Sequence, residues 1–122
     1  MDSLQLKICD VQGRLFELSR KACYDSGPFI SSFMRSRLAK SLDSVYNRMQ
    51  WSGEEYLLEE LESEVPTLPV TGALYEEEIL FWIGYLYRYW HYLTGESSLE
   101  IYRQANERTM KRNYMMFHTL EP

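Results

Sequence analysis

Cysteine and histidine are scarce in this chain, and their scarcity excludes several classes of protein. Only two of the 122 residues are cysteines, Cys9 and Cys23, and only two are histidines. On one helix the two cysteines would lie about 21 Å apart, far beyond the ~7 Å that a disulfide allows. Free thiols are typical of a reducing compartment, so we expect a cytoplasmic protein. With so few sulfur and imidazole ligands, we expect no zinc or other metal site and no cofactor.

A hydrophobic run long enough for a membrane is also missing, and so is the alternation typical of strands. The longest apolar run, residues 79–93, falls short of the ~20 residues that a membrane span needs. It also contains Arg88 and His91. The N-terminus lacks the basic and apolar segments of a secretory signal. The sequence therefore predicts a single all-α domain over residues 1–122, with no membrane partner.

Basic residues are almost absent from the middle of the chain. Residues 49–100 hold eleven acidic side chains against Arg88 alone, a net charge of −10, whereas residues 1–48 carry a net charge of +3 and residues 101–122 of +2. A nucleic-acid-binding protein usually has a basic face or a basic total charge. We therefore expect no nucleic-acid partner, and we interpret the acidic middle as a surface for a basic protein or as an aid to solubility.

Helical periodicity accounts for most of the chain. The apolar side chains predict helices near residues 3–24, 28–42, 52–65, 73–93 and 97–117. Capping-box patterns, Ser52 with Glu55 and Ser97 with Glu100, mark the start of two of them. The first helix has a narrow apolar seam made of Leu4, Ile8, Val11, Leu15, Leu18 and Ala22. This seam faces the core in the simpler interpretation, and a homodimer through it is the alternative. The prediction is a four- or five-helix bundle.

The aromatic helix of residues 79–93 is the predicted centre of that bundle. Twelve of its fifteen residues are apolar or aromatic, and the exceptions are Gly84, Arg88 and His91. A helix that is hydrophobic nearly all round must be surrounded by other helices or by a partner. Together with Glu77, the three exceptions fall within about 60° on one helical face. This polar stripe is the first candidate site.

Two interpretations of the stripe are open. A buried arginine is costly without a carboxylate, so Arg88 pairs with Glu100 or Glu107 of the next helix in the structural interpretation. In the functional one, Glu77, Gly84, Arg88 and His91 line a pocket for a ligand or protein partner, and Gly84 allows close approach. His91 as a catalytic base is a weaker idea, because no nucleophile is visible near it in the sequence.

A second candidate site lies near the C-terminus, in the segment Arg112-Asn113-Tyr114-Met115-Met116-Phe117-His118. An Arg followed by Asn, with a His after five intervening residues, resembles the catalytic motif of the HEPN ribonucleases, which are small helical proteins. The resemblance implies RNA cleavage without a metal. Arg112 would bind the phosphate, His118 would transfer protons and Asn113 would orient them. In the structural interpretation, these residues form a basic last helical turn that suits the helix dipole, with Arg112 close to Glu77.

A looser resemblance covers most of the chain. The segments Phe29-Ile30-Ser31-Ser32-Phe33-Met34 and Tyr85-Leu86-Tyr87-Arg88-Tyr89-Trp90 resemble small helical proteins encoded in bacterial toxin–antitoxin operons. This resemblance implies a non-enzymatic, antitoxin-like or accessory role in binding a partner protein. The ten tyrosines and three tryptophans fit such a role, because aromatic side chains often anchor interfaces. Protein binding is the leading functional prediction, and HEPN-like ribonuclease activity is the alternative.

Overall fold

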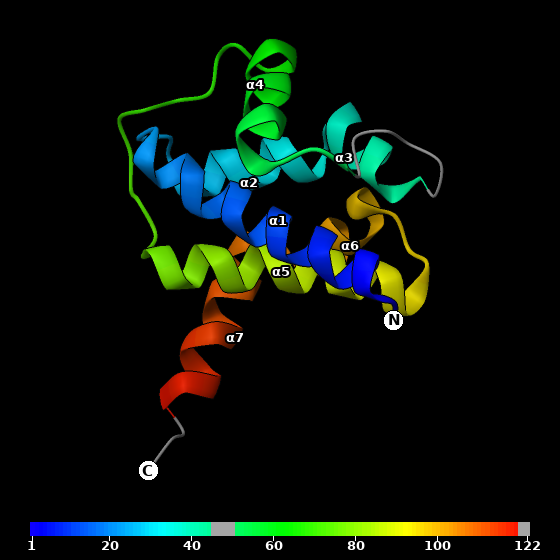
Figure 1. Ribbon diagram of the computed structural model, residues 1–122. Coiled ribbons are helices and arrows are strands. Elements are labelled where there is room, and N and C mark those ends of the chain that lie inside the picture. Colours follow the sequence, from blue (N-terminus) through cyan, green and yellow to red (C-terminus); the bar gives the residue numbers. More distant parts are fainter. Residues whose placement is uncertain (45–50, 120–122) are drawn as a thin grey trace.

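The computed structural model describes residues 1–44 and 51–119, and these residues form helices without strands (Figure 1). The helices are α1 (Ser3–Lys21), α2 (Ser26–Met34), α3 (Arg37–Asp43), α4 (Glu54–Glu64), α5 (Glu77–Thr94), α6 (Ser98–Gln104) and α7 (Glu107–Thr119). The all-α class is therefore confirmed. The predicted number of four or five helices is wrong, because the described part of the chain contains seven.

Two of the predicted helices are each divided in two by a capping residue. The Ser36 hydroxyl accepts a hydrogen bond from the Ala39 amide (3.0 Å) and starts α3. The Asn106 side chain accepts from the Thr109 amide (3.0 Å) at the start of α7. Such side chains satisfy amides that lack a partner in the first helical turn. The Ser97–Glu100 capping box is confirmed at α6, whereas α4 begins after Gly53 without a side-chain cap.

An antiparallel pair of helices, α1 and α5, forms the centre of the fold (Figure 1). Gly13 and Gly84 lie where the two helices cross. A Cβ atom on Gly84 would stand 2.7 Å from the Gln12 carbonyl oxygen and 3.0 Å from the Gly13 Cα. What approaches Gly84 so closely is therefore the backbone of α1. The prediction that the aromatic helix is central is confirmed, since its residues Ile79, Leu80, Ile83 and Tyr87 are buried.

The apolar seam of α1 is covered within the monomer. Ile8 and Leu15 are buried, and Val11, Leu18 and Ala22 pack against the core. The apolar side chains of the helix predicted near residues 28–42 are also buried, although the break at Ser36 divides this helix; they are Phe29, Ile30, Phe33, Met34, Leu38 and Leu42. The core-facing interpretation of the seam therefore agrees with the structure, and a homodimer would need another surface.

Helix α7 differs from the other helices because it extends away from the body (Figure 1). Its first half packs against α5 and α2. Met110 and Tyr114 are buried there, and the Tyr114 ring meets Trp82 edge to face with centroids 5.5 Å apart. Its second half carries three large apolar side chains that are about half exposed or more, namely Met115, Met116 and Phe117.

Candidate functional site

The Arg88 side chain is completely buried, and each of its three nitrogens donates a hydrogen bond. Nε donates to Gln12 Oε1 (2.8 Å), Nη1 to Asp43 Oδ1 (2.6 Å) and Nη2 to Ser98 Oγ (3.1 Å). These partners come from α1, α3 and α6, so the guanidinium joins three helices to α5. We call Arg88, Gln12, Asp43 and Ser98 the Arg88 network. Such complete pairing is what makes a buried charge tolerable.

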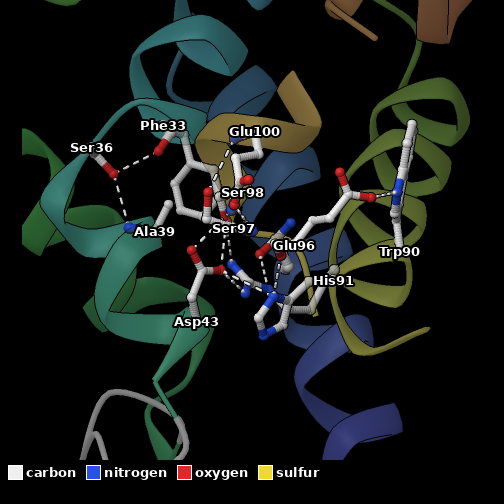
Figure 2. A network of polar contacts seen from close by, with 12 residues as sticks. Phe33, Ser36, Ala39, Asp43, Trp90, His91, Glu96, Ser97, Ser98 and Glu100 are labelled. Atoms are coloured by element: carbon white, nitrogen blue, oxygen red, sulfur yellow. Dashed lines mark hydrogen bonds and ion pairs between the residues drawn. The ribbon is translucent and has the colours of Figure 1, made fainter. Parts of the chain in front are cut away.

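Asp43 holds the other charge of this network. Its Oδ1 accepts from both Arg88 and the Ser98 hydroxyl (2.8 Å), and its Oδ2 accepts from the Ser98 backbone amide (2.9 Å). Ser98 is the first residue of α6, so the carboxylate also sits at the positive end of that helix (Figure 2). The side chain remains 12% exposed, which leaves one edge of the ion pair open to solvent.

The predicted partners of Arg88, Glu100 and Glu107, are wrong. The Glu100 carboxylate accepts from the Ser97 amide within the capping box (3.0 Å). This hydrogen bond is the main reason why the pKa of Glu100 is lowered. The Glu107 carboxylate accepts from the Tyr102 hydroxyl instead. Both acids are therefore engaged at helix starts, and the charge of Arg88 is matched by Asp43, which lies 45 positions away in the sequence.

Gln12 is a site residue that the sequence interpretation missed. It is buried on α1, donates from Nε2 to the Gly84 carbonyl (2.9 Å) and accepts from Arg88 through Oε1. The side-chain amide therefore connects two members of the predicted stripe. The sequence contained one signal, because Gln12 lies beside Gly13, where α1 comes closest to α5. A single glutamine in an amphipathic helix does not by itself indicate a site.

His91 lies on the open side of the network. Its Nδ1 is 3.7 Å from Asp43 Oδ1 and 2.6 Å from the Glu96 carbonyl oxygen (Figure 2). Next to it, the hydroxyl of Tyr92 is buried without a hydrogen-bond partner among the described residues. Burial raises the pKa of this phenol, which keeps it neutral. Both residues, together with Asp43, line a cavity of about 360 Å³.

Glu77 stands apart from the rest of the predicted stripe. It is exposed in the first turn of α5, and it faces Glu17 of α1. The pKa of Glu17 is raised by burial first and by the neighbouring Glu77 charge second. The structure thus connects Gly84, Arg88 and His91 through Gln12 and Asp43, while Glu77 belongs to a separate acidic surface at the other end of α5.

The residues of the HEPN-like motif all lie on α7. Arg112 is exposed, Asn113 is partly buried, and no ion pair joins Arg112 to Glu77 among the described residues. The His118 ring stacks on Tyr114, and its Nδ1 is 2.8 Å from the Tyr114 carbonyl oxygen. Arg112 and His118 lie six positions apart on one helix, which separates them by about 120° around the axis and ~9 Å along it. Within one chain, the two side chains therefore point in different directions.

The buried stripe of α7 continues beyond the body of the protein. Met110, Tyr114 and Phe117 fall within about 60° on one helical face. The first two are 2% and 9% exposed, whereas Phe117 is 64% exposed. Met115 lies on nearly the opposite side of the helix and is also exposed. The end of α7 is thus apolar on more than one side, a pattern typical of a helix that something else surrounds.

Other classes of site find no support in the part of the chain that the structure describes. There, no three His, Cys, Asp or Glu side chains gather as metal ligands would. None of the described helices is both long and apolar enough to cross a bilayer.

Comparison of the chain with family models, with curated proteins and with solved structures found no match.

Proposed function

We propose that this protein is a non-enzymatic interaction module that inserts the end of α7 into an apolar groove on a partner protein. The observation that carries the proposal is Phe117, which extends a buried stripe past the edge of the body and remains 64% exposed. Burying one such aromatic side chain contributes roughly 1.5–3 kcal/mol. Insertion of an amphipathic helix into a groove is a common mode of recognition.

The charge of α7 indicates the chemistry of that groove. Residues 108–119 contain Arg108, Lys111, Arg112 and no acidic residue. Arg108 and Arg112 are exposed and lie on the face of α7 that also carries Met115. A groove with carboxylates along its rim would complement this face. The acidic middle of the sequence favoured a basic partner, whereas the basic face of α7 favours an acidic one. The toxin–antitoxin resemblance makes a bacterial toxin the partner class to test first.

Site-specific cross-linking in the source cells tests this proposal. A photoreactive amino acid is placed at Phe117 and, as a control, at Tyr56, which is 47% exposed on α4. We expect one dominant adduct from position 117 and none of the same mass from position 56. Its partner should be a different protein that is cross-linked within an acidic-rimmed groove. Equal labelling from both positions, or an adduct with a second copy of this chain, would contradict the proposal.

Binding of the purified partner then measures the contribution of Phe117. We expect Phe117→Gln to weaken binding by at least about tenfold, as is usual when a central aromatic anchor is lost. Arg112→Ala should weaken it less and should reduce its dependence on salt. Tyr56→Gln, the matched control, should leave affinity unchanged. Unchanged affinity of Phe117→Gln would rule out α7 as the inserted helix.

HEPN-like ribonuclease activity stays the alternative prediction. It is favoured by the exposure of Arg112 and by the His118 ring, whose Nδ1 faces a carbonyl and whose Nε2 is therefore left for other partners. Bulk cellular RNA is incubated with the purified protein without metal and with the variants Arg112→Ala and His118→Ala. Cleavage that disappears in both variants would replace the interaction proposal. No cleavage, or equal cleavage by all three proteins, would remove the alternative.

A further inference from the structure

Beyond its first turn, the side of α5 that faces away from the core has no charged side chain. Four apolar or aromatic side chains fall within about 80° there, namely Trp82, Tyr85, Tyr89 and Leu93. The three aromatic ones are partly exposed, and Leu93 is 65% exposed. The exposed side of α1 is charged instead, with Lys7, Arg14 and Lys21. We call the four α5 side chains the outer face of α5.

The rings on this face are ordered by their contacts with one another. Tyr85 stacks on Tyr89 with centroids 6.3 Å apart, and the Phe81 ring lies 5.9 Å from Tyr85 on the other side. Phe81 also covers Gly13 of α1, where a Cβ atom would stand 2.8 Å from its ring. Rings that are already ordered lose little rotamer freedom when a partner covers them, and tyrosine is a frequent interface anchor.

The outer face of α5 meets the buried stripe of α7 at Trp82. The Trp82 ring contacts Tyr114 edge to face, with centroids 5.5 Å apart. Phe117 lies three residues further along α7, about 60° around the helix and ~4.5 Å along its axis. Its ring is therefore on the same side of α7 as the contact with α5. Figure 1 shows α7 leaving the body beside α5.

The exposed part of α7 is short compared with the wall of a groove. In the described chain, the axis advances by about 7.5 Å from Tyr114 to Thr119. A groove wall is at least one layer of secondary structure thick, which is about 10 Å for a helix or a sheet. A wall that packs against the Phe117 ring on the α5 side therefore also contacts the outer face of α5 near Trp82.

We propose that the outer face of α5 is the second half of the α7 interface and is covered by an apolar wall of the same partner groove. This inference rests on the proposed function, because the occupant is the partner that receives α7. The face extends about 16 Å from Trp82 to Leu93, so a partner helix of about three turns covers it. A partner there also explains why α5 is hydrophobic nearly all round.

Cross-linking from both halves of the interface in the source cells tests this inference. A photoreactive amino acid is placed at Tyr89, at Phe117 and, as a control, at Arg14 on the exposed side of α1. We expect adducts of the same mass from positions 89 and 117, and none of that mass from position 14. The inference alone is overturned if position 117 gives its adduct and position 89 gives none, or one with a second copy of this chain. Absence of an adduct from position 117 would contradict the α7 proposal as well.

Affinity for the purified partner gives a second test, in which the two outcomes have opposite signs. Tyr89→Lys should weaken binding at least about tenfold, because it buries an ammonium group against an apolar wall. Outside the interface, the same lysine would leave the affinity unchanged or raise it, since the rim of the groove is acidic.

Two controls accompany this variant. Tyr56→Lys adds the same charge at an exposed tyrosine of α4 and should not weaken binding. Thermal melts of Tyr89→Lys should match those of wild type, because Tyr89 lies outside the core cluster. An unchanged or higher affinity of Tyr89→Lys, with Phe117→Gln still weakened, would overturn the inference and not the α7 proposal.

Discussion

The Arg88 network and the end of α7 differ in how completely the rest of the fold covers their side chains. At the Arg88 network, every guanidinium nitrogen has a partner, and four helices meet around one buried charge. At the end of α7, Phe117 belongs to a stripe that is buried two turns earlier, yet it has no comparable cover. Arg88, the conspicuous polar residue, thus contributes to stability, and Phe117, an ordinary apolar residue, is the better candidate for binding.

Replacing Arg88 should have the largest effect on stability. Arg88→Ala leaves Asp43, Gln12 and Ser98 without their shared donor. We expect the free energy of unfolding to fall by about 3–5 kcal/mol, as for other buried pairs that lose one partner. Chemical denaturation measures the change. Arg112→Ala, the same substitution at an exposed position, should change it by less than about 0.5 kcal/mol, and similar losses in both variants would contradict the comparison.

The crossing of α1 and α5 should be the next most sensitive position. In Gly84→Ala, the new methyl group meets backbone atoms of α1 at 2.7 and 3.0 Å, which cannot move as a flexible side chain would. Overpacking of this kind costs about 1–3 kcal/mol, more than the ~1 kcal/mol that alanine contributes to helix propensity. Gly27→Ala, with its nearest neighbour at 4.0 Å, is the control. Thermal melts should show destabilisation of the Gly84 variant alone.

Cys9, buried beside the network, should make a smaller, pH-dependent contribution. Burial raises the pKa of its thiol from 9.0 to about 11, while the nearby Arg88 charge opposes this shift. The folded state therefore holds the proton more tightly than the unfolded state does. The resulting stability is fully present below pH 9.0 and is lost as the pH rises through about 11. The free energies of unfolding of wild type and Cys9→Ala should differ less at pH 11 than at pH 8. A difference that stays constant with pH would contradict a raised pKa for the Cys9 thiol.

The end of α7 should tolerate substitution with the least effect on the fold. Phe117→Gln removes an exposed ring from the overhanging part of the helix. We expect the free energy of unfolding to change by less than about 0.5 kcal/mol. Tyr114→Gln, three residues earlier on the same stripe but buried against Trp82, should cost more than about 1 kcal/mol. Equal effects at both positions would show that Phe117 is part of the core.

Local sequence patterns predicted the buried faces of the helices, but they could not predict which residues far apart in the sequence would pair. The apolar stripes through Leu15, Phe33 and Ile83 follow from helical repeats within a few residues. The break at Ser36 was missed because the apolar stripe continues through it, although serine is a good N-cap. Arg88 pairs with Asp43 rather than with Glu100 because the tertiary fold brings the end of α3 next to the start of α6. No sequence pattern near Asp43 indicates that contact.

A double-mutant cycle between Arg88 and Asp43 tests most directly whether the polar stripe of α5 is part of the fold. The unfolding free energies of wild type, Arg88→Ala, Asp43→Ala and the double variant are measured by chemical denaturation. We predict a coupling energy at the upper end of the range for contacting residues, about 1.5–3 kcal/mol, so that the double variant loses less stability than the sum of the two single losses. A coupling energy near zero would contradict the account, because Arg88 and Asp43 would then contribute independently to the fold.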